Sequence, residues 1–161
     1  MIDKRVDTVA EAFAGLGDGI SVMIAGFGEA GRPAYLIKGL LDSGIKDIHI
    51  ISNNAGDGET GLGALYHAGR VSKLTCSFPR GRLETLMENM LKDGKLELEV
   101  MPQGTLAERI RAAGCGIPAF YTPTSYGTLI AEGKETRDFD GRGYVLETAL
   151  HADVAMVHAE K

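Results

Sequence analysis

The sequence predicts an α/β protein with an open, mostly parallel sheet flanked by helices. Short apolar runs rich in branched residues alternate with segments in which apolar residues recur at helical spacing. Such alternation is typical of strand–helix–strand units, whose strands pair in parallel. The chain has 161 residues without internal repeats or long polar tracts, which is the size of one domain with a single core.

The first strand–helix–strand unit is predicted between residues 20 and 52. "ISVMIAGF" (20–27) is a nearly continuous apolar run bounded by glycines, which predicts a strand buried on both faces. Pro33 fits the first turn of a helix that Gly44 ends, and "KDIHIIS" (46–52) is the second strand. Ahead of this unit, the spacing of Val9, Phe13 and Leu16 predicts a helix over 7–16.

The alternation continues along the chain. Strands are predicted at 71–76 and 95–100, and helices at 82–92 and 105–113. "RDFDGRGYVLE" (137–147) predicts a hairpin, because Asp140-Gly141 is a favoured two-residue turn. "ADVAMVHAE" (152–160) is predicted to be a final apolar strand.

Charge and composition argue against several classes of protein. The net charge is -5 and Lys and Arg are scattered, whereas nucleic-acid-binding proteins carry a concentrated basic patch. The N-terminus lacks the apolar core of a signal peptide, and no run of about 18 apolar residues predicts a membrane helix. Cys76 and Cys115 make no disulfide framework, and the histidines lack metal-ligand spacing. We therefore expect a cytoplasmic protein that has no metal site and binds neither nucleic acid nor membranes.

The loop "AGFGEAGRP" (25–33) contains G-x-G-x-x-G, the fingerprint of a dinucleotide-binding turn. In that fingerprint the turn opens directly into a helix, but here Pro33 places the helix start after the motif. The fingerprint also requires an acidic residue at the end of the next strand, where it binds the ribose of the dinucleotide. Here that strand ends in Ser52-Asn53-Asn54. Asp47 lies at the wrong end of that strand. A nucleotide-binding module remains an alternative, but the sequence does not favour it.

Three loops at predicted strand ends share a different character. "AGFGEAG", "SNNAG" and "MPQG" combine glycine with uncharged amide side chains, and the carboxyl ends of parallel strands meet at one edge of a sheet. No acid–base pair accompanies them. These loops therefore predict a site for a carbonyl group or a flexible polar chain, and not a self-sufficient hydrolase.

Several blocks of the sequence resemble the family I CoA-transferases. "DGISVMIAGFGEAGRP" is similar to the family's first signature: Asp-Gly, an apolar strand, Gly-Gly-Phe, then Gly-x-Pro. "SNNAG", "PQGTLAERIRAAGCGIPAFYTPT" and "YGTLIAEGKETRDFDGRGYVLE" resemble later blocks, so the resemblance covers essentially the whole chain. It is strongest to the α (A) subunit of 3-oxoacid CoA-transferases. "NNAGDGETGLGAL" and "CSFPR" resemble the 3-oxoadipate branch more than the acetoacetate branch, which stays open as an alternative.

The resemblance implies a NagB/ribose-phosphate-isomerase-like α/β fold and a two-subunit enzyme. CoA would pass from succinyl-CoA to a 3-oxoacid through a glutamyl-CoA thioester. The glutamate that forms this thioester would belong to a partner β subunit, in the sequence Ser-Glu-Asn-Gly. That tetrapeptide is absent here, so the chain should be inactive alone and act in a heterodimer or heterotetramer. The resemblance implies no cofactor, because the CoA thioester is a substrate.

The resemblance also implies which residues form the site. Gln103 and Asn53 are expected to support the reacting carbonyl and its oxyanion. The residues expected to bind CoA are Ala25, Gly26, Phe27, Gly28, Glu29, Ala30, Gly31 and Asn54. Ala25 departs from the family pattern, because it replaces the first glycine of Gly-Gly-Phe. Arg80 and Arg82 fit either a pairing with the distal carboxylate of a dicarboxylic acyl group or a solvated pair of charges.

Family α subunits continue beyond "HADVAMVHAEK", where this sequence stops. The resemblance therefore predicts that residues 1–161 form a single α-subunit domain that lacks the family's C-terminal part. A non-catalytic truncated fragment is the corresponding alternative function.

Overall fold

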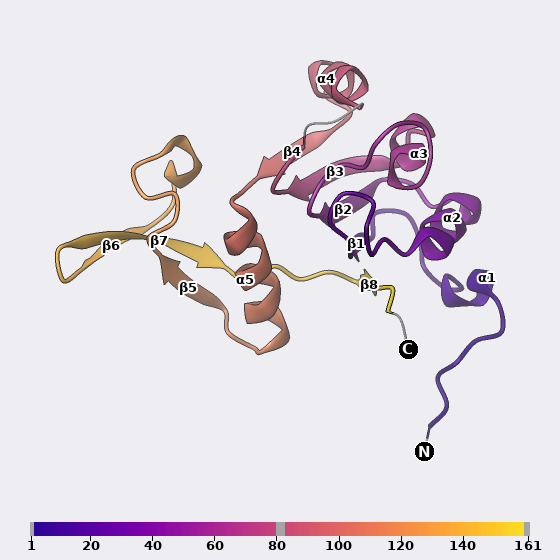
Figure 1. Ribbon diagram of the computed structural model, residues 1–161, viewed down its shortest axis with the longest axis horizontal. Helices are drawn as coiled ribbons and strands as arrows, with labels where there is room; N and C mark the ends of the chain where they lie inside the picture. Colours follow the sequence, from indigo (N-terminus) through magenta and orange to yellow (C-terminus); the bar gives the residue numbers. More distant parts are fainter. Residues whose placement is uncertain (1, 80–82, 160–161) are drawn as a thin grey trace.

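The computed structural model of the protein describes residues 2–79 and 83–159 and contains two separate sheets (Figure 1). The larger sheet is parallel throughout, in the order β4-β3-β2-β1-β8. Its strands are β1 (Ser21–Ile24), β2 (Ile48–Ser52), β3 (Val71–Cys76), β4 (Glu97–Val100) and β8 (Val154–Met156). The smaller sheet is antiparallel, in the order β5-β7-β6, with strands β5 (Ala119–Thr122), β6 (Thr136–Phe139) and β7 (Arg142–Thr148). The prediction of an α/β protein with a mostly parallel sheet is confirmed.

Helices cover the two faces of the parallel sheet unequally (Figure 1). The helices are α1 (Val9–Ala12), α2 (Ala34–Ser43), α3 (Leu62–His67), α4 (Glu84–Lys92) and α5 (Gln103–Gly114), with a 3₁₀ turn at Leu129–Ala131. Side chains of α2, α3 and α4 share one apolar cluster with β1, β2 and β3. Helix α5 contributes Leu106 to a smaller cluster that contains Ile51 on the opposite face.

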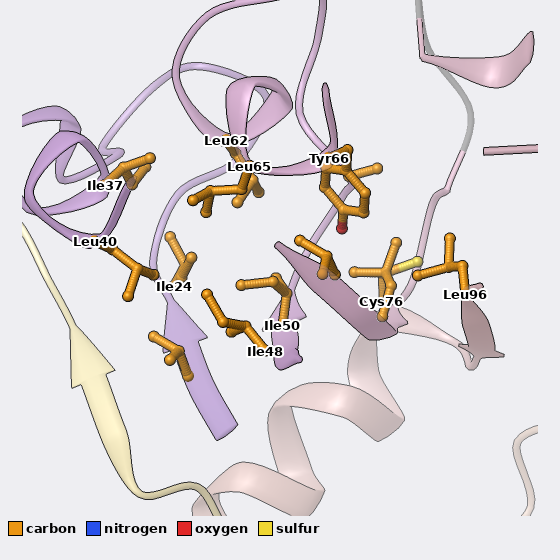
Figure 2. Packing of buried hydrophobic residues seen from close by; sticks show 14 of the residues in the cluster. Ile24, Ile37, Leu40, Ile48, Ile50, Leu62, Leu65, Tyr66, Cys76 and Leu96 are labelled. Carbon is orange, nitrogen blue, oxygen red and sulfur yellow. The ribbon is translucent and has the colours of Figure 1, made fainter. Parts of the chain in front are cut away.

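The main core lies between the parallel sheet and helices α2–α4 (Figure 2). Leu40 of α2 and Leu65 of α3 are fully buried, as are Ile48 and Ile50 of β2. Strand β1 differs from its prediction, because Val22 and Ile24 are buried whereas Ser21 and Met23 on the α5 face are only half-buried. The expectation of burial on both faces is therefore wrong for β1.

Strand β8 joins the parallel sheet beside β1, with Val22 opposite Val154. The carboxylate of Asp153 accepts hydrogen bonds from the backbone N and the hydroxyl of Ser21, at 2.8 and 2.7 Å. The hairpin is also confirmed, and Asp140 and Gly141 between β6 and β7 have φ of 55° and 78°, as its two-residue turn requires.

Helix α5 connects the two sheets (Figure 1). Nε of Arg109 donates to the backbone O of Thr148 in β7 at 2.7 Å, and Nη1 donates to the carboxylate of Glu99 in β4 at 2.8 Å. A single buried side chain therefore fixes α5 to both sheets, and with it the position of Gln103 at the first turn of the helix. Within residues 2–79 and 83–159, no helix is both long and apolar enough to cross a membrane.

Candidate functional site

A cavity of about 610 Å³ opens at the carboxyl edge of the parallel sheet. Its lining comes from the loops after β1, β2 and β3 and from the first turn of α5, where the topology of an open α/β sheet places ligand sites. The lining residues are Phe27, Gly28, Glu29, Asn53, Asn54, Gly56, Asp57, Ser77, Phe78 and Gln103. Phe27 and Phe78 are 68% and 58% exposed, so two aromatic rings lie open to solvent at the cavity.

The structure brings most of the predicted site residues to this cavity or beside it. Phe27, Gly28, Glu29, Asn53, Asn54 and Gln103 line the cavity. Ala25 and Gly26 line a second, more apolar cavity of about 330 Å³ on the α5 face, which shares Asn53 and Gln103 with the first. Within the glycine loop (residues 25–31), Ala30 and Phe27 exchange two backbone hydrogen bonds of 3.0 and 3.1 Å, and Gly31 follows with φ of 70°. The roles of these residues in binding or catalysis stay predictions.

Asn53 is held in one orientation by two neighbours. Its Oδ1 accepts hydrogen bonds from Nε2 of Gln103 at 2.8 Å and from the hydroxyl of Ser77 at 2.9 Å. The backbone N–H groups of Ser77 and Phe78 both donate to the backbone O of Asn53, at 3.2 and 3.1 Å. Because Oδ1 accepts twice, the Asn53 amide presents its NH₂ as a donor for which no described residue is an acceptor, and Gln103 offers Oε1 as an acceptor.

Arg32 is a site component that the sequence did not indicate. Its side chain is only 7% exposed, although arginine is usually found at the surface. Nε donates to the backbone O of Gly28, and Nη2 donates to Oδ1 of Asn54. The carboxylate of Glu29 lies 3.7 Å from Nε. Arg32 thus contacts both the glycine loop and the second loop of the cavity, and only the sequence position beside Pro33 could have drawn attention to it.

The charged side chains among the described lining residues are both acidic, Glu29 and Asp57. Arg80 and Arg82, which the sequence offered as partners for a carboxylate, lie outside the described residues. In the part of the chain that the structure describes, no three His, Cys, Asp or Glu side chains lie together as a metal site would require.

Cys76 ends β3 close to the cavity, and it is buried. Burial raises the pKa of its thiol to about 11 and outweighs the effect of the backbone N–H of Phe78. Since the thiolate is the nucleophilic form, Cys76 is an unreactive thiol near neutral pH. The cavity therefore offers amide donors, aromatic surface and carboxylates, without an activated nucleophile among the described side chains.

The family model for coenzyme A transferase matches residues 6–161. The chain belongs to the coenzyme A transferase family. The resemblance found in the sequence is thereby confirmed.

Individual relatives agree with this assignment. The chain is 56% identical over 161 residues to the α (A) subunit of a 3-oxoadipate CoA-transferase of Pseudomonas putida, covering 100% of this chain and 70% of that protein. It is 50% identical over 157 residues to the α (A) subunit of a succinyl-CoA:3-ketoacid coenzyme A transferase of Xanthomonas campestris, covering 97% of this chain and 64% of that protein.

A solved structure supports the fold. An acyl-CoA transferase of Escherichia coli O157:H7, crystallised as a thioester complex with CoA, superposes with a TM-score of 0.77 at 20% identity. The match covers 93% of this chain and 33% of the other. It confirms the predicted CoA-transferase fold.

Proposed function

We propose that this chain is the α subunit of an enzyme that transfers CoA from succinyl-CoA to a 3-oxoacid, with 3-oxoadipate as the favoured acceptor. The observation that carries the proposal is the Asn53 amide, which Gln103 and Ser77 orient at a cavity where a thioester carbonyl can bind. The 56% identity to the α (A) subunit of a 3-oxoadipate CoA-transferase supports the choice of acceptor. An acetoacetate-type enzyme is the nearest alternative.

The chemistry of the proposed reaction matches what the cavity offers. The partner subunit's glutamate attacks the thioester carbonyl, and a C–O bond forms as the C–S bond breaks, which gives a mixed anhydride and the CoA thiolate. The thiolate then attacks the glutamyl carbonyl, so the glutamyl-CoA thioester forms as the anhydride C–O bond breaks and succinate leaves. The carboxylate of the 3-oxoacid takes up CoA by the same two steps in reverse, which frees the glutamate. Each addition places a negative charge on a carbonyl oxygen, and preoriented N–H donors stabilise that charge. The Asn53 NH₂ is such a donor, and its orientation is set before any substrate arrives.

The nucleophile is proposed to come from a partner protein because the residues that the structure describes offer no better candidate at the cavity. Glu29 is a carboxylate of the glycine loop itself, but it lies 3.7 Å from the Arg32 guanidinium and its side chain is 67% exposed. Ser-Glu-Asn-Gly is absent from the sequence. We therefore propose a heterodimer or heterotetramer with a β subunit, located in the cytoplasm, and without a cofactor beyond the CoA substrate.

The test is CoA transfer by this chain co-purified with a β subunit, measured with succinyl-CoA and either 3-oxoadipate or acetoacetate. Transfer by the mixture and not by either protein on its own is the expected result, and the faster acceptor decides the branch. A complex that forms without transferring CoA would favour a non-catalytic fragment. NAD binding by the chain alone, measured by calorimetry, would favour a nucleotide-binding module.

A further inference from the structure

Arg32 contacts the glycine loop and lines a separate cavity of about 170 Å³ instead of the one of about 610 Å³ described above. Gly28 and Glu29 line that larger cavity, whereas Arg32 does not. The fit around the arginine is close, because a Cβ built on Gly26 would lie 2.6 Å from Cγ of Arg32 and one built on Gly56 would lie 3.2 Å from Nη1. Glycine at both positions makes room for this side chain between the two loops.

The contact with Gly28 fixes the direction of one peptide group. Nε of Arg32 donates to the O of Gly28, so this carbonyl points toward the guanidinium. In a trans peptide the carbonyl and the following N–H point in opposite directions, and the described chain contains no cis peptide. The N–H of Glu29 therefore points away from the Arg32 guanidinium, and Glu29 itself lines the cavity.

This N–H is also unused within the described part of the chain. In the glycine loop the N–H groups of Phe27 and Ala30 are occupied by each other's carbonyls, but none of the described residues accepts from the N–H of Glu29. Gly28 has φ of 60°, and glycine tolerates either orientation of the peptide that follows it. The Arg32 guanidinium is the side-chain contact that holds this peptide in the orientation observed.

We infer that Arg32 is a positioning residue that orients the Gly28–Glu29 peptide, so that the backbone N–H of Glu29 and the Asn53 NH₂ donate together to the oxyanion of a bound thioester. The inference rests on the proposed function for the chemistry of the ligand. Arg32 itself does not touch the substrate. Its second bond, to Oδ1 of Asn54, keeps the two donor loops at a fixed separation.

The first test is steady-state transfer by the complex of this chain with its β subunit, carrying Arg32→Met. Methionine fills the same apolar space but cannot donate, so kcat should fall by about 10²-fold while KM changes by less than about threefold. Arg32→Lys supplies an ammonium group in place of the planar guanidinium, so its kcat should lie between those of the wild type and Arg32→Met. Arg32→Met leaves the O of Gly28 and Oδ1 of Asn54 without this donor, so Tm should fall. The kcat values are therefore compared at a temperature well below the Tm of every variant, where a loss of kcat in an intact complex separates positioning from folding.

Arg70→Met is the matched control. Nη1 of Arg70 also donates to a backbone carbonyl, that of Gly44 at 2.8 Å, but Arg70 precedes β3 at the opposite edge of the sheet from the cavity. This variant should keep the wild-type kcat. If Arg32→Met retains as much kcat as Arg70→Met in a complex that transfers CoA, the inference is wrong.

A second measurement does not depend on turnover or on a stable variant. The chain is labelled with ¹⁵N-glutamate in complex with an unlabelled β subunit, and the Glu29 amide signal is identified by its disappearance in Glu29→Gln. Acetyl-CoA should shift this signal downfield, and S-ethyl-CoA, a thioether without the carbonyl, should not. Equal shifts with both ligands would overturn the inference, even if Arg32→Met could not be purified. An absence of transfer by the wild-type complex would instead count against the proposed function.

Discussion

Nε2 of Gln103 lies 2.8 Å from Oδ1 of Asn53, so one hydrogen bond joins side chains 50 residues apart in the sequence. Asn53 follows β2 directly, and Gln103 is the first residue of α5. The hydroxyl of Ser77 donates the second hydrogen bond to Oδ1. These two bonds fix the orientation of the Asn53 amide, so that its NH₂ group is the part presented as a donor. The donor that the cavity offers is thus set by two residues that need not touch the substrate themselves.

The first prediction is that Asn53→Ala lowers the kcat for CoA transfer more than Gln103→Ala does. Removing a donor to an oxyanion costs about 10²–10³-fold, and removing a group that only orients the donor should cost less, about tenfold. Because both changes act through one donor, the double variant should be little worse than Asn53→Ala. The measurement is a double-mutant cycle in kcat on the complex with a β subunit.

Asn53→Asp serves as the control for this cycle. Aspartate keeps the acceptor for Gln103 and Ser77 but replaces the free NH₂ with a second carboxylate oxygen. It should therefore be at least as slow as Asn53→Ala. Losses that simply multiply in the double variant would mean that Gln103 and Asn53 act independently.

Gly56→Ala is predicted to destabilise the fold strongly. A Cβ there would lie 2.9 Å from both the backbone N of Gly63 and Cβ of Leu62, and φ at Gly56 is +90°. Overlap and backbone strain together should cost about 2–4 kcal/mol in the free energy of unfolding, measured by urea titration.

Gly58→Ala is the matched comparison for Gly56→Ala. Gly58 has a similar positive φ of +68°, but nothing lies within 4 Å of the added Cβ. Only the strain remains, about 1–2 kcal/mol. Equal losses in the two variants would show that the space around Gly56 can relax.

Local patterns predicted where strands β1–β4 and the start of α2 lie in the sequence. The apolar runs at 20–27 and 46–52 contain β1 and β2, the strands predicted at 71–76 and 95–100 correspond to β3 and β4, and Pro33 directly precedes α2, which begins at Ala34. Helix α1 is only Val9–Ala12, although the apolar spacing continued to Leu16, because the backbone leaves the helical conformation at Phe13 (φ -101°, ψ 0°) and Gly15 then takes a positive φ of 84°. Apolar spacing alone does not show where such a turn ends a helix.

The elements and contacts that were missed depend on tertiary packing. Helix α3 contains Gly63 and has no side-chain cap, so it has few local signals, yet Leu62, Leu65 and Tyr66 are fully buried in the core. Strand β5 was missed because "AFYT" is too short for periodicity to identify. The burial of Arg32 depends on Asn54, 22 residues further on, which no local pattern indicates.

Tyr66→Phe is predicted to leave stability unchanged or to raise it by up to about 1 kcal/mol. The hydroxyl of Tyr66 is buried, and no described residue hydrogen-bonds to it. Burying a hydroxyl without a partner is unfavourable, so its removal should not be costly. Tyr66→Ala is the contrast, because the cavity left in the core (Figure 2) should cost about 3–5 kcal/mol. A loss above about 1 kcal/mol in Tyr66→Phe would mean that an ordered water satisfies the hydroxyl.

The pH dependence of stability should carry a contribution from His49 in β2. Its Nε2 lies 2.8 Å from the hydroxyl of Thr75. Burial is the main cause that lowers the pKa of His49 below its ordinary value of 6.5, and the charge of Lys73 adds to it, against weaker opposing effects of Glu99 and Glu97. Between the lowered pKa and 6.5 the unfolded chain binds more protons than the folded one, so stability falls as the pH is lowered through that interval.

The variant that isolates this effect is His49→Gln, which retains a hydrogen-bonding side chain for Thr75 but does not titrate. Urea titrations between about pH 8 and pH 5 should show a steeper fall in the free energy of unfolding for the wild type than for the variant, beginning below about pH 6.5. The titration of Glu99 does not contribute to the difference between the two proteins in this pH range. Burial would raise the pKa of Glu99, but the hydrogen bond and charge of Arg109, with Lys73 and Thr75, bring it below 4.5. Its contribution is therefore lost only in more acidic solution, and identical curves for the two proteins would show that His49 titrates alike in the folded and unfolded chain.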